Sequence, residues 1–111
     1  METIFTKILD GRVPCKKVYS DDKCLAFHDI EPQAPVHILL IPRKVITSLK
    51  DAQEEDKELF GHLLITANNI AKSQNLYEWR TVINTGASAG QTVFHLHLHI
   101  LGGRVMKWPP G

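Results

Sequence analysis

The sequence predicts an α+β fold, in which helices cover one face of a five-stranded antiparallel β-sheet. Three observations predict it. Several segments of about four to eight residues have the composition or the apolar–polar alternation of strands. One long segment and one short segment have helical periodicity instead. The connections between the last strands are too short for several of the crossover helices that a parallel sheet needs.

Length and composition favour one compact domain. The chain has 111 residues, 43% of them hydrophobic, which is enough for one core without disulfide bonds. The net charge of +1 does not favour binding to nucleic acid or to an anionic membrane surface. No run of about 18 apolar residues is present, so no spanning helix is expected.

Two features lead us to expect a cytoplasmic protein. The first seven residues lack the pattern of a secretory signal. The two cysteines, Cys15 and Cys24, form no CxxC motif. Reduced thiols are therefore expected, and a disulfide between them is the less favoured alternative.

The first half of the chain predicts a short helix and three strands. Apolar residues at 4, 5, 8 and 9 predict the helix, which ends at Asp10-Gly11. Residues 17–20 and 23–28 predict two strands joined by an acidic turn. After an ordered loop at 29–35, residues 36–42 predict a nearly apolar strand interrupted only by His37. His37 is equally consistent with a buried, hydrogen-bonded histidine and with a member of a histidine site.

The second half predicts one long helix, two strands and a tail. Asp51-Ala52-Gln53-Glu54 resembles a capping box, and helical spacing of apolar residues predicts a helix over about 52–73. His62 lies off the apolar stripe of this helix, so we expect it to be exposed and outside any site. Strands are predicted at 79–84 and 94–101, and Trp108 followed by two prolines suggests a docked tail.

The last strand carries the chemistry that the sequence predicts. Successive side chains of a strand point to opposite faces, so His95, His97 and His99 should share one face and the apolar residues between them the other. The small, glycine-bearing loop at 84–92 precedes this strand and could bring backbone N–H groups close to an anion. Imidazole can act as nucleophile, acid, base or metal ligand near neutral pH. Together these features favour chemistry at phosphorus over a set of purely structural histidines.

The segment from His95 to Leu101 is similar to the His-φ-His-φ-His-φ-φ signature of the histidine triad (HIT) superfamily, where φ is an apolar residue. The resemblance covers residues 3–111, which we expect to be a single HIT domain. Further matching segments are 26–30, 33–37, 41–44 and 90–94. The 90–94 segment, together with the tail from Leu101 to Gly111, resembles the Hint branch, the histidine triad nucleotide-binding proteins.

The resemblance implies a purine nucleoside phosphoramidate hydrolase of the adenosine 5'-monophosphoramidate type. Such an enzyme cleaves the P–N bond through a covalent nucleotidyl-histidine and requires no metal or other cofactor. The resemblance also implies a homodimer in which the five-stranded sheet of each subunit continues into that of the other. The implied ligand is a purine nucleotide or nucleoside phosphoramidate, and neither a membrane nor a nucleic acid is an expected partner.

The resemblance assigns roles to particular residues. His97 would be the nucleophile, with His37, His95 and His99 orienting it and stabilising charge. Asp29 would bind the ribose hydroxyls, Thr92 would contact the leaving group, and Trp108 would approach the partner's site. The phosphate would be held by Asn84, Gly90, Gln91, Thr92 and Val93, and the base by Ile4, Phe5, Ile8, Phe27, Ile30 and Leu39.

Three positions distinguish this chain from relatives or from a sister branch. Relatives often have serine where Thr92 stands, so its extra methyl group could tighten the leaving-group contact. Many have histidine where Val45 stands, and we expect little loss there. The transferase branch has glutamine at the position of His99, so the histidine favours hydrolysis over transfer to a sugar phosphate.

Physical reasoning supports a phosphoramidase and leaves three alternatives. A neutral imidazole can attack phosphorus while a nearby acid protonates the leaving amine. Two of the strand histidines in His-x-His spacing, together with His37, could instead bind zinc, although the sequence indicates no nearby carboxylate or cysteine as a further ligand. A non-catalytic nucleotide-binding regulatory protein would use the same residues. A dinucleoside polyphosphate hydrolase of a sister HIT branch is disfavoured by the tail at 108–111.

Overall fold

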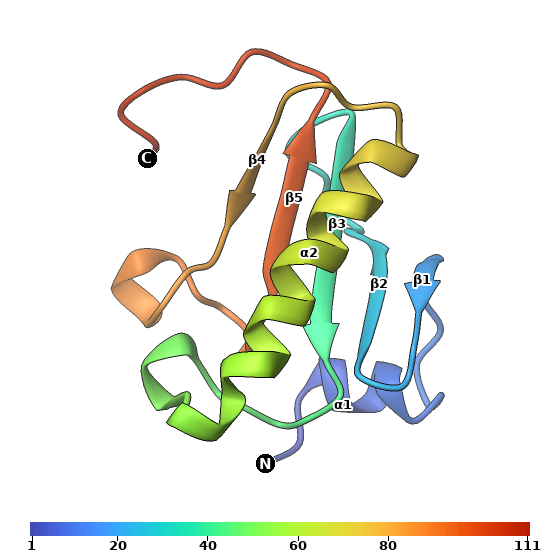
Figure 1. The fold of residues 1–111 in the computed structure, drawn as a ribbon, viewed down its shortest axis with the longest axis vertical. Coiled ribbons are helices and arrows are strands. Elements are labelled where there is room, and N and C mark those ends of the chain that lie inside the picture. Colours follow the sequence, from blue (N-terminus) through green and yellow to red (C-terminus); the bar gives the residue numbers. More distant parts are fainter.

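The computed structural model describes residues 1–111 and contains one antiparallel sheet of five strands (Figure 1). The strands are β1 (Lys17–Ser20), β2 (Cys24–His28), β3 (Val36–Pro42), β4 (Trp79–Val82) and β5 (Leu98–Gly102), in the spatial order β1-β2-β3-β5-β4. All neighbouring pairs are antiparallel. The predicted α+β class and five-stranded antiparallel sheet are confirmed.

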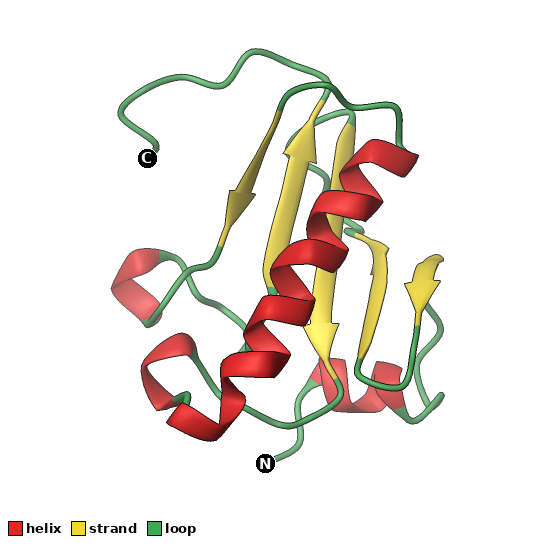
Figure 2. Cartoon of the chain, in the orientation of Figure 1, coloured by secondary structure: helices red, strands yellow, loops and turns green.

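The two helices, α1 (Ile4–Leu9) and α2 (Lys57–Ser73), cover opposite faces of the sheet (Figures 1 and 2). The alternation of side chains in β2 and β3 separates the two layers of the core. The layer under α2 contains Ala26, Ile38, Leu40, Leu63 and Ile70. The layer under α1 contains Phe5, Leu25, Phe27, Leu39 and Ile41. The expectation of helices on one face is therefore wrong, because both faces of β2 and β3 are apolar and each needs a cover.

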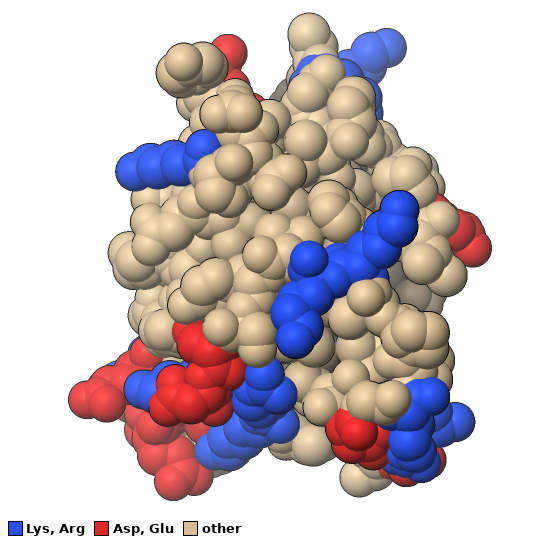
Figure 3. All heavy atoms as spheres, turned by 90° about the vertical axis from the view of Figure 1, so that its right-hand side faces the viewer, with Lys and Arg blue, Asp and Glu red and all other residues tan.

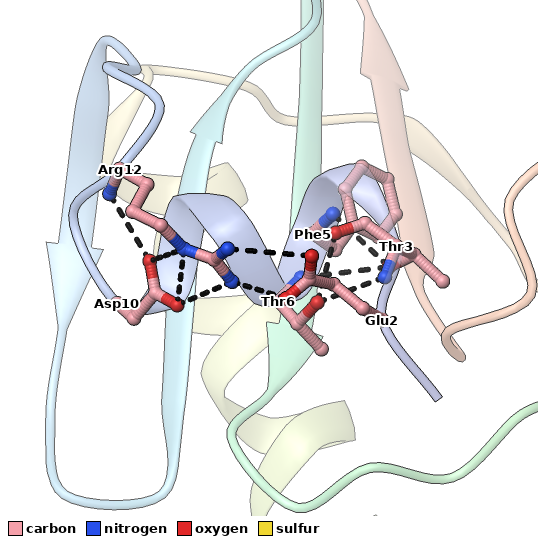
Figure 4. Close-up of polar contacts among 6 residues, drawn as sticks. All are labelled: Glu2, Thr3, Phe5, Thr6, Asp10 and Arg12. Atoms are coloured by element: carbon pink, nitrogen blue, oxygen red, sulfur yellow. Dashed lines mark hydrogen bonds and ion pairs between the residues drawn. The ribbon is translucent and has the colours of Figure 1, made fainter.

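Helix α1 is too short to be stable by itself, and its ends are held by side chains (Figure 4). Thr3 Oγ1 accepts from the Phe5 N–H at 3.1 Å, and the Thr3 N–H donates to Thr6 Oγ1 at 2.8 Å. At the other end, Arg12 donates to Asp10 at 2.8 Å and also pairs with Glu2. These contacts fix the helix in the position from which Phe5 enters the core.

Helix α2 begins five residues later than predicted. Asp51 does not cap it, because its carboxylate accepts the hydroxyls of Thr47 and Ser48 at 2.6 and 2.9 Å. The capping box is formed instead by Gln53 and Asp56 around a 3-10 turn that leads into the helix. Leu64 is one of the apolar residues whose helical spacing predicts this helix, but it is 52% exposed.

Strand β5 begins at Leu98, four residues later than predicted. Its ladder with β3 ends at the pair of Leu40 and Leu98, close to Pro42, which has no N–H to donate to a further rung. The Leu96 N–H donates to the Ile46 carbonyl at 2.7 Å instead. The segment before β5 is therefore extended but bonded to the chain that follows β3.

On the face shown in Figure 3, acidic and basic side chains lie close to one another toward the lower edge. Cys15 and Cys24 are both free thiols. Neither helix is long and apolar enough to cross a bilayer.

Candidate active site

The predicted separation of histidines and apolar residues in the last strand is confirmed. Leu96, Leu98 and Ile100 are buried in the layer under α2. The three histidines lie on the other face, where the Phe5 ring of α1 packs edge-on against His95 and His97. Phe94 departs from the pattern and is 40% exposed.

His97 has one ring nitrogen held by the backbone and one left free. Its Nδ1 lies 2.8 Å from the carbonyl oxygen of His95, which can only accept, so Nδ1 carries the proton. In the neutral ring Nε2 then has the lone pair. The ring is 7% exposed in relative area and is positioned by Phe5, whose ring centroid lies 5.0 Å away. His97 therefore has the tautomer that a nucleophile requires.

His95 contacts the His97 ring through its backbone carbonyl. Its ring is fully buried, and Nε2 donates to the Pro42 carbonyl at 2.8 Å. This bond ties the irregular segment before β5 to the end of β3. The ring does not line the cavity, whereas the His95 carbonyl holds Nδ1 of His97.

His37 and His99 form a directly bonded pair. The Gln33 N–H donates to His37 Nδ1 at 3.0 Å, so the proton of the neutral His37 ring must be on Nε2. This Nε2–H faces two acceptors, Nδ1 of His99 at 2.9 Å and a carboxylate oxygen of Asp29 at 3.3 Å. His99 therefore accepts through Nδ1 and presents Nε2–H to its surroundings.

Burial keeps the histidines of the site neutral near pH 7. It lowers the pKa of His97, although the bond to the His95 carbonyl and the charge of Asp29 act in the opposite direction. Burial and the neighbouring His97 and His37 lower the pKa of His99 to about 4, against the opposing charge of Asp29. Burial likewise lowers the pKa of His37, and Asp29 partly offsets it. A neutral His97 at physiological pH follows.

The glycine-bearing loop is shaped by Gln91, whose side chain is buried. Its Oε1 accepts from the Gly86 N–H at 2.9 Å, and its Nε2 donates to the carbonyls of Thr47 and Val93. Gly86 and Gly90 adopt φ values of +90° and +101°, which L-residues rarely tolerate. The backbone N–H groups of Thr92 and Val93 donate to no acceptor within the chain and remain able to bind an anion.

A cavity of about 1200 Å³ joins the histidines to the apolar wall beneath α1. Most of the predicted site residues line it: Ile4, Phe5, Ile8, Phe27, Asp29, Ile30, His37, Leu39, Gly90, Thr92, Val93, His97 and His99. Ile30 lies at the rim, since it is 94% exposed.

Four predicted residues do not line the cavity: His95, Asn84, Gln91 and Trp108. The side chain of Asn84 faces the Gly90 carbonyl at 3.5 Å, and that of Gln91 is fully used inside the loop. Trp108 is 82% exposed in the single chain, so the docking that we expect for the tail is not made on its own chain. The tail is held by a bond from Arg80 to the Lys107 carbonyl.

The sequence interpretation missed several lining residues, among them Cys15, Lys16, His28 and Gln33. Gln33 fixes the tautomer of His37 through its main-chain N–H, so its side-chain identity gives no signal of this role. His28 could have been found from the sequence, because it is a titratable residue at the end of a predicted strand and directly precedes Asp29.

The argument against a zinc site from a missing carboxylate is wrong, because Asp29 lies beside His37 and His99. The distance between His37 and His99 is a better argument against a zinc site. Two nitrogen ligands on a tetrahedral zinc ion lie about 3.3 Å apart. The 2.9 Å between His37 Nε2 and His99 Nδ1, with a proton between them, is that of a hydrogen bond. As built, these residues form a hydrogen-bonded chain that fits zinc poorly.

A second polar cluster outside the cavity corrects the expectation for His62. This residue is half-buried, and its Nε2 contacts the Asp21 carboxylate at 2.7 Å. The same carboxylate accepts from Tyr19 Oη and from the N–H groups of Lys23 and Cys24, each at 2.8 Å. Burial would raise the pKa of Asp21, but these bonds outweigh it and hold that pKa well below its usual range. The cluster joins the β1–β2 turn to α2.

Comparisons with known proteins show which family and which solved structures this chain resembles. The family model of the HIT domain matches residues 10–106. An uncharacterised HIT-like protein of Synechococcus elongatus is 56% identical over 111 residues, which are 99% of this chain and 97% of the relative. A HIT family hydrolase from Legionella pneumophila has a TM-score of 0.96 at 46% identity, with 99% and 100% of the two chains covered. A histidine triad nucleotide-binding protein from Candida albicans has a TM-score of 0.79 at 28% identity, with 89% and 73% covered.

Proposed function

The chain belongs to the HIT domain family, and from that premise we propose that it is a purine nucleoside phosphoramidate hydrolase of the Hint branch. The proposed reaction cleaves the P–N bond of an adenosine 5'-monophosphoramidate type of substrate through a nucleotide covalently bound to His97. We propose the whole segment 3–111 as the functional domain. The Legionella protein is named a hydrolase and the Candida protein a nucleotide-binding protein, and both support the class of activity.

One observation carries the proposal. His97 has an unprotonated Nε2 and lines the cavity together with Thr92 and Val93, whose backbone N–H groups donate to no acceptor within the chain. A nucleophile beside anion-binding donors is what attack on a phosphoryl group requires. A simple nucleotide-binding module needs the donors but has no use for a histidine held in this tautomer.

The chemistry follows from the two ring nitrogens of His97. Nε2 attacks phosphorus, the P–N bond breaks, and the leaving amine departs with a proton supplied by a neighbouring acid. Nδ1–H donates to the His95 carbonyl and stabilises the positive charge that develops on the ring. Water then attacks phosphorus, breaks the P–Nε2 bond and releases the nucleoside monophosphate. In this proposal the Thr92 hydroxyl contacts the leaving group, and His99 Nε2–H stabilises charge on the phosphoryl oxygens.

The cavity wall suggests how the nucleoside is bound. In this proposal the base lies against Phe5, Phe27 and Leu39, which are buried, and against the more exposed Ile4, Ile8 and Ile30. The loop from Gly90 to Val93 holds the phosphate with its N–H groups, while Asn84 and Gln91 maintain the shape of the loop. Asp29 accepts from the ribose hydroxyls.

The first test compares two classes of substrate. The purified protein should hydrolyse an adenosine phosphoramidate at least about a hundredfold faster than a diadenosine polyphosphate, because protonation makes an amine a good leaving group. A strong chelator should leave this activity intact, because nucleophile and acid are both protein groups. Faster turnover of the polyphosphate would favour the sister branch, and loss of activity that zinc restores would favour the metal site. AMP binding without turnover of either substrate would favour a regulatory nucleotide-binding protein.

We also propose that the protein is a homodimer with a continuous sheet. The edge strand β4 has one side free, and Leu64 and Ile65 of α2 are 52% and 62% exposed. The exposed Trp108 would approach the partner's site across this interface. Sedimentation at micromolar protein should give twice the mass of one chain, whereas a species of one chain mass alone would refute the dimer.

A further inference from the structure

Asp29 faces both the proposed ribose position and the histidine pair. One carboxylate oxygen accepts the Glu31 N–H at 2.8 Å and shapes the loop. The other lies 3.3 Å from His37 Nε2, the same atom that bonds to His99 Nδ1 at 2.9 Å. His37 has a single proton at Nε2, because its Nδ1 is occupied by the Gln33 N–H. Asp29 and His99 therefore compete for one proton.

We propose that Asp29 is a positioning residue for His99 in addition to a ribose ligand. When the ribose hydroxyls bind to Asp29, the hydrogen bond from His37 to His99 strengthens, and His99 is held beside the reacting centre. The proposal rests on the function proposed above and deepens it: the enzyme uses the ribose to speed the chemical step as well as to bind the substrate.

The transmission follows from the acceptor capacity of the carboxylate. Two hydroxyls that donate to Asp29 weaken it as an acceptor for His37. The His37 proton is then directed to His99 alone, and the short bond between the two rings strengthens. This holds the His99 ring, whose centroid lies 5.0 Å from that of His97. An interaction completed only when the ribose is bound and the phosphoryl group reacts raises kcat.

Two titratable groups, Asp29 and His97, lie beside the pair of His37 and His99. Asp29 lies after β2, His37 is on β3, and His97 and His99 come from the β5 segment. The negative charge of Asp29 raises the pKa of both His37 and His99, against the larger effect of burial. The same geometry therefore links Asp29 to the ionisation of both rings.

The kinetic test uses substrates with and without the ribose hydroxyls. We expect the wild-type kcat for a 2',3'-dideoxyadenosine phosphoramidate to be roughly tenfold below that for the ribo substrate. In Asp29→Asn, the amide N–H2 that replaces the carboxylate oxygen cannot accept the His37 proton, which is then directed to His99 whether or not a ribose is bound. We therefore expect kcat for the dideoxy substrate to be roughly tenfold higher in Asp29→Asn than in wild type. Asp22→Asn removes an exposed carboxylate nearby in sequence and should change neither value.

A ribose ligand without a positioning role gives a different result. The dideoxy substrate would then differ from the ribo substrate in KM alone, and its kcat would be the same in wild type and Asp29→Asn. Either outcome overturns the proposal. The wild-type comparison needs no variant, so it decides the question even if Asp29→Asn folds poorly.

A second readout is independent of activity. The ring nitrogens of His37 and His99 can be titrated by NMR in the ligand-free protein. Both pKa values should be lower in Asp29→Asn than in wild type and unchanged in Asp22→Asn; identical values in Asp29→Asn and wild type would overturn the proposal. If the wild type fails to hydrolyse phosphoramidates, the proposed function falls, while this titration still decides whether Asp29 acts on the histidine pair.

Discussion

Replacement of His97 by alanine is expected to reduce phosphoramidate turnover by at least about a thousandfold, while AMP still binds. The loss is large because Nε2 of His97 would form the covalent bond to phosphorus, and no other ring in the cavity has the same tautomer fixed by a backbone carbonyl. Binding should survive because the apolar wall and the N–H groups of the glycine-bearing loop are untouched. Steady-state kinetics and calorimetry with AMP measure the two effects.

The matched control is His62→Ala, which removes a histidine outside the cavity. Turnover per folded molecule should stay near that of the wild type, because His62 contacts the β1–β2 turn and no part of the site. Near-normal turnover by His97→Ala would contradict the proposed mechanism. Loss of AMP binding together with turnover would show that His97 is needed for the shape of the site.

The second large effect concerns stability. Asp21→Ala is expected to lower the free energy of unfolding at pH 7 by about 3 kcal/mol. The substitution leaves the N–H groups of Lys23 and Cys24, the Tyr19 hydroxyl and the His62 ring without their common acceptor. Denaturant unfolding of both proteins measures the difference. Asp22→Ala removes the adjacent, exposed carboxylate and should cost far less.

The pH dependence of this difference has a definite sign. The folded-state pKa of Asp21 is depressed below the unfolded value of about 3.9. The stabilisation is therefore fully present above that unfolded value and is lost as the pH falls toward the folded pKa. The gap between wild type and Asp21→Ala should shrink between pH 5 and acid unfolding. A gap that is independent of pH, or equal to that of Asp22→Ala, would refute this role for the Asp21 carboxylate.

The parts of the fold that could be predicted depend on side-chain periodicity. Alternation placed His97 and His99 on one face and Leu98 and Ile100 on the other, and the structure confirms it. The bounds of β1, β3 and α1 agree with the prediction, because turns or prolines delimit each of them in the sequence. The nucleophilic role assigned to His97 requires one free ring nitrogen, and the structure adds that the other ring nitrogen, Nδ1, donates to the His95 carbonyl.

The parts that could not be predicted depend on long-range contacts of the backbone or on competition between side chains. Nothing in the identity of Gln33 indicates that its N–H sets the tautomer of His37. Asp51 has the spacing of a capping residue, yet Thr47 and Ser48 take its carboxylate. His62 lies off the apolar stripe as predicted. Its side chain is nevertheless half-buried, because Asp21 of the β1–β2 turn contacts it.

The most direct measurement of the central claim is the identity of the covalent adduct. Wild-type protein mixed with an adenosine phosphoramidate and quenched within milliseconds should contain one AMP per chain at most, and peptide mapping should place it on His97. The mapping should be done under alkaline conditions, where phosphorylated imidazole is more stable than in acid. An AMP adduct on His97 that forms and decays at rates compatible with turnover is the predicted result. An adduct on another histidine, or turnover without any adduct, would contradict nucleophilic catalysis by His97.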